Sequence, residues 1–186
     1  MKARDMLIAG LAALVLGAAA YLWFGGQGGA NRAPAVRMTL LDGRHLDLAS
    51  LRGHPVLVNF WATTCPGCVA EMPQLSKMYK ELAPQGFKLI GVAMYYDPPS
   101  QVRAMRKARD ISYPIVLDGN GAISKAFGDV RLTPTSFLID AQGHIVYQKL
   151  GNLDIPQLRV RIEKLLGSEA ASSAALQLSQ ANTPLS

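Results

Sequence analysis

The position of the only two cysteines constrains the fold most, because they form a Cys-Pro-Gly-Cys box at residues 65–68. Residues 55–61, before the box, are nearly all apolar and predict a short strand buried on both faces of a sheet. The residues after the box have large side chains at helical spacing, on one face of a predicted helix: Met72, Leu75, Met78 and Tyr79. The box is therefore expected where a strand turns into a helix, and two thiols at this spacing can close and reopen a disulfide.

The start of a helix favours a thiolate, because its first turn carries unpaired backbone N–H groups and the positive end of the helix dipole. We therefore expect Cys65 to be the attacking sulfur. Cys68 lies one turn further into the helix and is expected to be more buried, so that it resolves the mixed disulfide. Pro66 suits the first helical position, where no N–H is required.

The residues around the box predict one α/β domain at residues 36–167, beginning with a hairpin around Asp42-Gly43. Strands alternate with helices, and a second hairpin and a last helix follow. This order predicts a mixed sheet covered by helices on both faces. Further strands are expected at residues 88–94, 114–117, 135–140 and 144–149, and helices at residues 99–110, 122–127 and 155–166.

Residues 1–26 are expected to form an N-terminal transmembrane anchor. The uncharged run at residues 6–24 nearly spans a hydrocarbon layer of about 30 Å. Tyr21 and Trp23 continue past the small residues where a signal peptide would be cut, which favours an uncleaved anchor over a cleaved signal peptide. Basic residues before the run favour a cytoplasmic N-terminus, which places the domain on the outer, periplasmic side of the cytoplasmic membrane.

Two further segments are expected to lack regular structure: a flexible linker at residues 27–35 and a disordered polar tail at residues 168–186. The formal net charge of +6 comes without a basic run that contains interleaved aromatics, so nucleic acid is not an expected partner. The one basic cluster, around residues 103–109, is interpreted as a solvated helix face, with contact to anionic lipid or an acidic partner as the alternative.

Four motifs carry a resemblance to a known family. They are Asn59-Phe60-Trp61-Ala62, Cys65-Pro66-Gly67-Cys68, Glu71-Met72-Pro73 and Thr133-Pro134-Thr135-Ser136-Phe137-Leu138-Ile139-Asp140. Over roughly residues 36–166 the chain resembles the thioredoxin superfamily, and within it the membrane-anchored TlpA/ResA-like thiol:disulfide interchange proteins. The resemblance implies a thioredoxin-like fold and a redox-active disulfide between Cys65 and Cys68, with neither a cofactor nor a metal.

Glu71 is the third expected catalytic residue, beside Cys65 and Cys68. It lies three residues after Cys68 on the same helix face, where its carboxylate could exchange protons with the resolving thiol. The alternative is a solvated helix glutamate. Asn59 favours the catalytic interpretation, because many cytosolic thioredoxins have a buried aspartate there, and TlpA/ResA-like proteins use a glutamate after the second cysteine instead.

The resemblance also implies a substrate-binding group of Thr133, Pro134 and Trp61. The family holds the loop proline, here Pro134, in the cis form opposite the box, and the residue before it offers its backbone to an incoming peptide. Pro73 is expected to interrupt the hydrogen bonding of the helix that carries the box, whereas in the alternative the helix ends there.

The leading hypothesis is a monomeric reductase of extracytoplasmic protein disulfides. The resemblance implies substrates in cytochrome c maturation or in oxidase copper-site assembly, and a transmembrane thiol reductase as electron donor. A disulfide oxidase or isomerase would use the same residues in reverse. A Cu(I)-binding chaperone module is a further alternative, although the three histidines have no ligand spacing to the box. A peroxiredoxin-type peroxidase is disfavoured. It needs a threonine three residues before its cysteine and a proline seven residues before it, and this chain has Ala62 and Val58 at those positions.

Overall fold

The computed structural model describes residues 32–181, with side chains as far as residue 168. The expected anchor at residues 1–26 and most of the expected linker lie outside the described residues, as do residues 182–186. Along the described part of the chain, no helix is both long enough and apolar enough to span a membrane.

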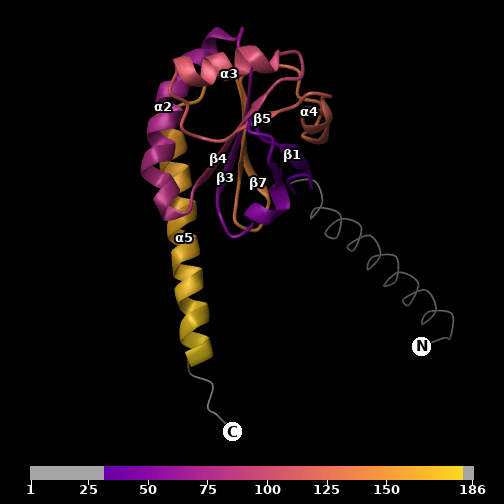
Figure 1. The fold of residues 1–186 in the computed structure, drawn as a ribbon. Coiled ribbons are helices and arrows are strands. Elements are labelled where there is room, and N and C mark those ends of the chain that lie inside the picture. Colours follow the sequence, from indigo (N-terminus) through magenta and orange to yellow (C-terminus); the bar gives the residue numbers. More distant parts are fainter. Residues whose placement is uncertain (1–31, 182–186) are drawn as a thin grey trace, which may run out of the picture. The chain divides into compact units, whose positions relative to one another are not determined.

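Five strands form the central sheet, in the order β5-β4-β3-β6-β7 (Figure 1). The strands β3, β4 and β5 are parallel, whereas β6 pairs antiparallel with both β3 and β7. The sheet is therefore mixed, as predicted. Its strands are β3 (Val56–Trp61), β4 (Lys88–Ala93), β5 (Ile115–Leu117), β6 (Thr135–Ile139) and β7 (Ile145–Leu150).

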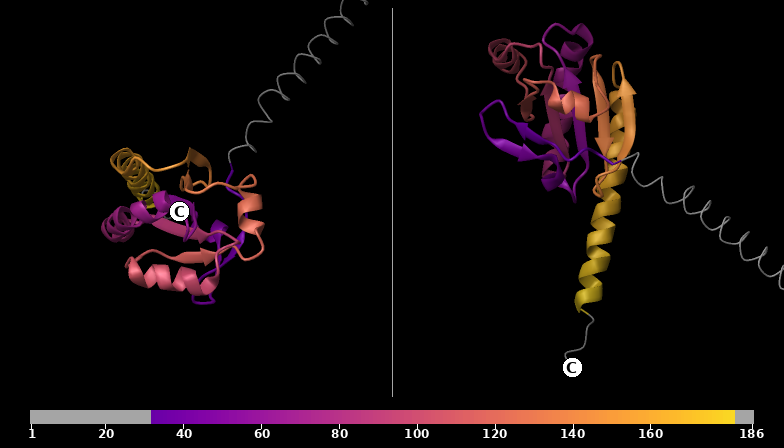
Figure 2. Two further views of the ribbon diagram at one scale, coloured as in Figure 1. Left: turned by 90° about the horizontal axis from the view of Figure 1, so that it is seen from above. Right: turned by 90° about the vertical axis from the view of Figure 1, so that its right-hand side faces the viewer.

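Helices cover both faces of this sheet. On one face, α2 (Pro66–Leu82) and α5 (Ile155–Ala181) lie side by side, and α3 (Pro99–Ala108) adds Val102 to the same core (Figure 2). On the other face lie α4 (Ala122–Ala126) and the antiparallel pair β1 (Arg37–Thr39) and β2 (His45–Asp47). Every strand and helix predicted within residues 36–166 is present, and two short 3-10 helices, η2 (Leu48–Leu51) and η3 (Ala83–Gln85), were not predicted.

The last helix differs from the prediction. Helix α5 continues to Ala181, so residues 168–181, expected to begin a disordered tail, are helical. The reason lies in composition, because alanine is the most frequent residue of this stretch and has the most favourable helix propensity, and no proline occurs at residues 157–183. Gly167 lowers the helix propensity by only about 1 kcal/mol relative to alanine, which an already formed helix can tolerate.

The two cores on either side of β3 explain why apolar and polar residues do not alternate in its sequence. Leu57 and Trp61 belong to the core beneath α2 and α5, whereas Val56, Val58 and Phe60 belong to the core beneath α4. Because both faces are covered, apolar residues are required at successive positions. Asn59 is the one polar residue of the strand, and its Nδ2 donates a hydrogen bond of 2.9 Å to Ser136 Oγ on β6.

Gly91 of β4 provides the space in which two large side chains meet. A Cβ atom at this position would lie 2.9 Å from Tyr113 Cε2 and 3.1 Å from Trp61 Nε1, and both of these residues are fully buried. We predict that Gly91→Ala lowers the free energy of unfolding by about 1–3 kcal/mol, because neither ring can move aside in a packed core. Urea denaturation checks this against Gly119→Ala, whose Cβ would meet nothing within 4 Å. Equal losses in the two variants would contradict the packing argument.

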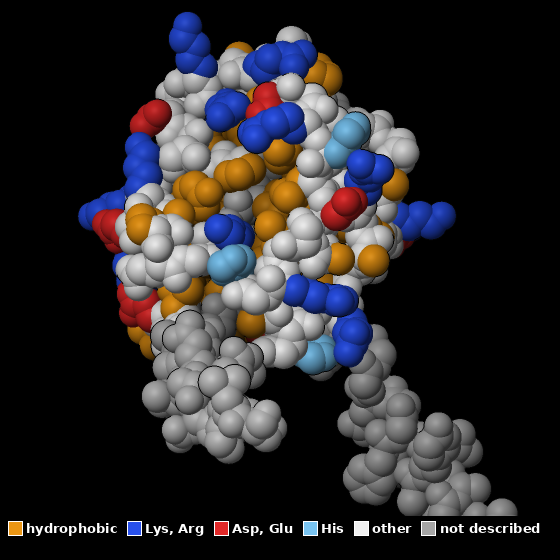
Figure 3. Space-filling view, turned by 60° about the horizontal axis from the view of Figure 1, so that its bottom comes forward, with side chains coloured by type: hydrophobic (Ala, Val, Ile, Leu, Met, Phe, Trp, Pro, Cys, Tyr) orange, Lys and Arg blue, Asp and Glu red, His pale blue; other side chains and the backbone are white. Residues whose placement is uncertain are grey.

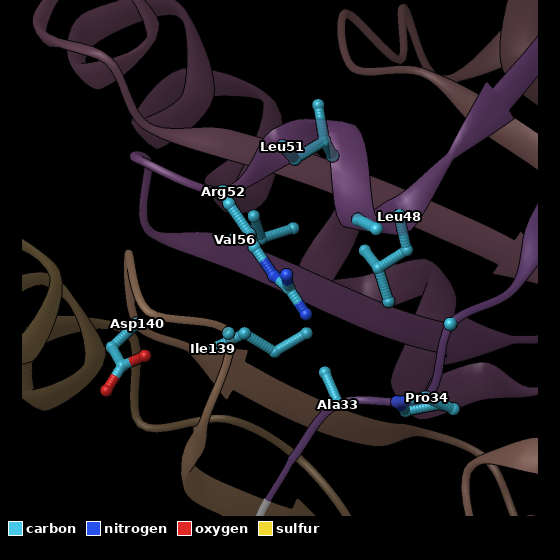
Figure 4. Close-up of a pocket in the computed structure, with 11 residues that line it drawn as sticks. Ala33, Pro34, Leu48, Leu51, Arg52, Val56, Ile139 and Asp140 are labelled. Carbon is cyan, nitrogen blue, oxygen red and sulfur yellow. The ribbon is translucent and has the colours of Figure 1, made fainter.

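A small apolar cavity of about 30 Å³ lies far from the box. Its lining includes Val56, the first residue of β3, and Ile139, the last of β6, with Leu48 and Leu51 of η2 above them (Figure 4). Because the box follows the last residue of β3, this cavity lies at the opposite end of the strand. Figure 3 shows that end of the domain, with apolar side chains gathered on the face and Lys and Arg side chains spaced around them. We assign this end no part in the redox chemistry.

Candidate active site

The box begins helix α2 directly after the loop that follows β3. Cys65 and Cys68 form a disulfide, with their Cα atoms 5.3 Å apart. Cys65 is the N-cap residue, and its Sγ accepts a hydrogen bond of 3.2 Å from the backbone N–H of Cys68. Cys65 is half-buried, whereas Cys68 is only 3% exposed. An incoming thiol or disulfide therefore reaches Cys65 first.

The turn before the box is held by Asp97, which follows β4 and is itself buried. The backbone N–H of Thr63 donates to Asp97 Oδ2 at 2.6 Å, and the Thr63 hydroxyl donates to Oδ1 at 3.0 Å. Sequence reasoning missed this residue. Its position after β4 could have indicated it. The carboxyl ends of neighbouring parallel strands meet at one edge of a sheet, so residues that follow β4 lie near the box that follows β3.

The connection between β7 and α5, residues 151–154, lies against the start of α2. The Asn152 side chain packs on Gly67, where a Cβ atom would lie 2.5 Å from Asn152 Oδ1. The next residue, Leu153, donates its backbone N–H to Glu71 Oε1. Neither contact was predicted, because the two segments are far apart in sequence. This connection fixes one oxygen of the Glu71 carboxyl group.

Glu71 is 5% exposed, so the structure contradicts the alternative of a solvated helix glutamate. Burial raises the pKa of its carboxyl group above the ordinary value of 4.5, and the hydrogen bond from Leu153 lowers it in part. The other oxygen, Oε2, accepts no hydrogen bond from the described residues. Glu71 is thus a buried carboxyl group within one turn of Cys68, with its proton affinity increased by the surrounding core.

The loop before β6 reaches the same edge of the sheet as the box. The Thr133–Pro134 peptide bond is cis, as the resemblance implied. Thr135 pairs with Phe60, which places Pro134 beside the end of β3. Pro134 is buried and Thr133 is half-buried, while the preceding Leu132 is exposed.

Two exposed tyrosines, Tyr95 and Tyr96, follow β4 and precede Asp97, which holds the turn before the box. Their rings pack edge to face, with centroids 5.2 Å apart. Sequence reasoning did not single out these residues or Leu132. Leu150, which pairs with Thr135, is also exposed at this edge of the sheet, so several apolar side chains are exposed near the box.

The structure corrects the expectation that Trp61 binds substrate. Trp61 is 1% exposed, and its indole packs over Gly91 in the core beneath α2 and α5. The reason is strand parity, because Trp61 has the same orientation as Leu57 and therefore faces the helices. Trp61 presents no surface to a partner protein.

No group of three or more His, Cys, Asp or Glu side chains in the described part of the chain is arranged to hold a metal ion. His54 precedes β3, at the end of this strand opposite the box. His45 lies in β2, where it pairs with Thr39 of β1. His144 precedes β7, where its backbone N–H donates to Asp140.

The fold and the site together define a class of protein: a thioredoxin-like α/β domain with a disulfide at the start of a helix and a cis-proline at the same sheet edge. Residues 29–162 match the Redoxin family, and the chain belongs to that family.

Known relatives agree on the activity. The chain is 31% identical over 135 residues to the thiol-disulfide oxidoreductase ResA of Bacillus thuringiensis, which covers 73% of this chain and 77% of that protein. It is 31% identical over 144 residues to the sporulation thiol-disulfide oxidoreductase A of Bacillus subtilis, and the match covers 74% of this chain and 86% of that protein. A solved structure of a thioredoxin-family thiol:disulfide interchange protein from Chlorobium tepidum matches with a TM-score of 0.67 and 30% identity, over 73% and 96% of the two chains. The protein is a TlpA/ResA-like thiol-disulfide oxidoreductase.

Proposed function

We propose that the protein works as a reductase of disulfides in extracytoplasmic proteins. The observation that carries the proposal is the buried carboxyl group of Glu71 near the resolving cysteine. An ionised carboxylate in a core disfavours a second negative charge nearby, and so disfavours the thiolate forms of the reduced pair. A pair whose thiolate forms are disfavoured has a lower reduction potential and tends to pass its electrons to a substrate.

In the first step, the Cys65 thiolate attacks one sulfur of the substrate disulfide. A bond forms between Cys65 Sγ and that sulfur, the substrate S–S bond breaks, and the other substrate sulfur leaves as a thiolate. The half-buried position of Cys65 and its place at the N-cap of α2 support this assignment.

In the second step, the Cys68 thiol gives its proton to the Glu71 carboxylate and attacks Cys65 Sγ. The Cys65–Cys68 disulfide forms and the mixed disulfide breaks, which releases the second substrate sulfur as a thiolate. In total, two electrons pass from the protein to the substrate, whose two thiolates become a dithiol by taking one proton from Glu71 and one from solvent. The structure corresponds to the oxidised product of this cycle.

Substrate recognition is proposed to use the backbone of Thr133 together with the exposed side chains of Tyr95, Tyr96 and Leu132. These residues lie at the sheet edge that carries Cys65. An extended segment on either side of a substrate cysteine could then pair with the loop before Pro134 while its apolar residues contact the tyrosines.

The remaining parts of the proposal rest on the sequence. Residues 6–24 would anchor a monomer in the cytoplasmic membrane, with the domain on its outer side. The substrates would belong to cytochrome c maturation or to oxidase copper-site assembly, and a transmembrane thiol reductase would restore the dithiol. No cofactor is required, because the electrons stay on sulfur throughout the cycle.

The direction of transfer is tested by the reduction potential of the Cys65–Cys68 pair, measured on the full chain in detergent against dithiothreitol buffers. We expect a value near the thioredoxin end of the superfamily, about −270 mV. A value near −120 mV would make the protein a disulfide donor and would overturn the reductase assignment.

A further inference from the structure

Three polar side-chain atoms in the core beneath α2 have no hydrogen-bond partner among the described residues. They are Trp61 Nε1, Glu71 Oε2 and the Tyr113 hydroxyl. Each belongs to a residue that is at most 5% exposed. The set is chemically complementary, because an indole N–H only donates, a carboxylate oxygen only accepts and a phenol does both. Buried polar groups of a native protein are normally paired, so a shared partner is expected.

The structure places two of these groups side by side over Gly91 and the third on the helix that covers them. Gly91 lacks a side chain, and the Tyr113 ring and the Trp61 indole both reach the space above it, 2.9 Å and 3.1 Å from a Cβ placed there. Tyr113 also packs edge to face against Tyr79 of α2, with ring centroids 6.4 Å apart. Tyr79 lies two helical turns after Glu71, so Tyr113 lies beneath the same face of α2.

Electrostatic coupling supports this placement. Burial raises the pKa of the Tyr113 phenol, and the nearby negative charge of Glu71 raises it further. The phenol therefore stays protonated and able to donate at neutral pH. No direct hydrogen bond joins Tyr113 to Glu71 within the described side chains. Two buried polar groups that lie near each other without a direct hydrogen bond can be joined by a bridging water molecule.

We propose that Tyr113 and Trp61 are positioning residues for Glu71, and that all three share one buried water molecule. The water would accept hydrogen bonds from Trp61 Nε1–H and the Tyr113 hydroxyl and would donate one to Glu71 Oε2, which satisfies every member of the set. Buried waters make about three hydrogen bonds of this kind. The inference rests on the proposed role of Glu71 as the proton acceptor of Cys68.

The function of this cluster is to set the proton affinity of Glu71. Donors to the second carboxylate oxygen stabilise the charged form against the desolvation that opposes it. Without them, Glu71 would hold its proton to higher pH and could not take one from Cys68. The cluster would therefore keep the base available near neutral pH.

Few other ionisable groups face Glu71. On α2 they are the two cysteines of the box and, further along, Tyr79. The connection before α5 brings Asp154, which is exposed and accepts a hydrogen bond from the Gln157 backbone N–H. From β4 and α3, the residues in this core are Gly91 and Val102, which do not titrate. Among the described residues, Tyr113 is therefore the titratable side chain best placed to act on Glu71.

The test is the pH dependence of disulfide reduction by the full-length protein in detergent, with a small disulfide-bonded peptide as substrate. The rate should rise with pH as Glu71 ionises, and this rise forms the acidic limb of the pH–rate profile. In Tyr113→Phe, which keeps the ring over Gly91, we expect this limb to move about one unit to higher pH. This corresponds to a roughly tenfold lower rate on that limb. Trp61→Phe removes the other donor and should move the limb in the same direction.

Tyr79→Phe is the matched control, because it removes a hydroxyl from the neighbouring ring in the same core. We expect its pH profile to equal that of the unmodified protein. An unmoved limb in Tyr113→Phe, or an equal shift in Tyr79→Phe, would overturn the inference.

Glu71→Gln separates this inference from the proposed function. If that variant loses the limb while Tyr113→Phe leaves it in place, the cluster is refuted and the role of Glu71 stands. If Glu71→Gln keeps the limb, the role of Glu71 and the cluster both fail. A carboxyl signal of Glu71 followed by infrared or carbon-13 titration gives the same comparison without turnover, and it remains usable if a variant is slow.

Discussion

Cys68→Ser is expected to stop turnover and to leave the substrate attached to Cys65 as a stable mixed disulfide. The reason is that Cys65 is the half-buried sulfur at the helix N-cap, whereas Cys68 is buried behind it and is needed only for release. Mixing the reduced variant with a disulfide substrate should give a covalent adduct on a non-reducing gel, and multiple-turnover activity should fall to the rate of uncatalysed exchange.

Cys65→Ser is the matched control for this trap. It has the same number of thiols but lacks the accessible one, so no adduct should form at an appreciable rate. If Cys65→Ser captured substrate as well as Cys68→Ser, the two sulfurs would be equally accessible and the assigned order of attack would be wrong. Cys68→Ser produced in cells, with no substrate added, would trap the natural substrate, and this would decide between the cytochrome and copper-site hypotheses.

The box could be predicted from sequence because its signals are local. Apolar residues at every position of β3 except Asn59 indicate a strand covered on both faces, and the helical spacing after Cys68 indicates α2. Pro66 at the start of this helix and Pro73 inside it could also be placed, since proline has positional rules of its own.

The same strand shows why the environment of the site could not be predicted. When both faces of a strand are apolar, the sequence carries no information about which face each residue occupies, and so Trp61 was assigned to the wrong surroundings. The contacts of Asp97 with Thr63 and of Leu153 with Glu71 join segments distant in sequence. The proposed role of Tyr113 as a positioning residue depends on its packing over Gly91 and on the nearby charge of Glu71, and neither of these follows from the sequence.

Glu71→Gln is expected to slow disulfide reduction by about a hundredfold at neutral pH, the lower end of what proton transfer by a positioned side chain contributes. The amide cannot accept the Cys68 proton, although its oxygen can still accept the hydrogen bond from the Leu153 backbone. Loss of the buried charge should also move the reduction potential of the pair to a less negative value, because thiolates are no longer opposed by a carboxylate. Stopped-flow kinetics and equilibration with dithiothreitol measure the two effects.

Glu81→Gln is the matched control on the same helix, since Glu81 is exposed and forms an ion pair with Arg159. Such surface pairs contribute about 0–1 kcal/mol, so this variant should retain the rate and the potential of the unmodified protein. A slow Glu81→Gln would show that the helix as a whole is sensitive to the loss of a charge. An unchanged rate and pH profile in Glu71→Gln would remove Glu71 from the mechanism.

The stability of the oxidised protein should respond to Glu71→Gln in the opposite sense to its activity. The pKa of Glu71 is raised in the folded state, so folding favours the protonated form. That stabilisation is fully present below the ordinary value of 4.5 and is lost as the pH rises through the raised pKa. Glu71→Gln removes this dependence, so its melting temperature should match the unmodified protein at pH 4 and exceed it at pH 8. A carboxyl group that weakens the fold at the pH where it works is expected of a residue placed for proton transfer, because packing alone would favour a neutral side chain there.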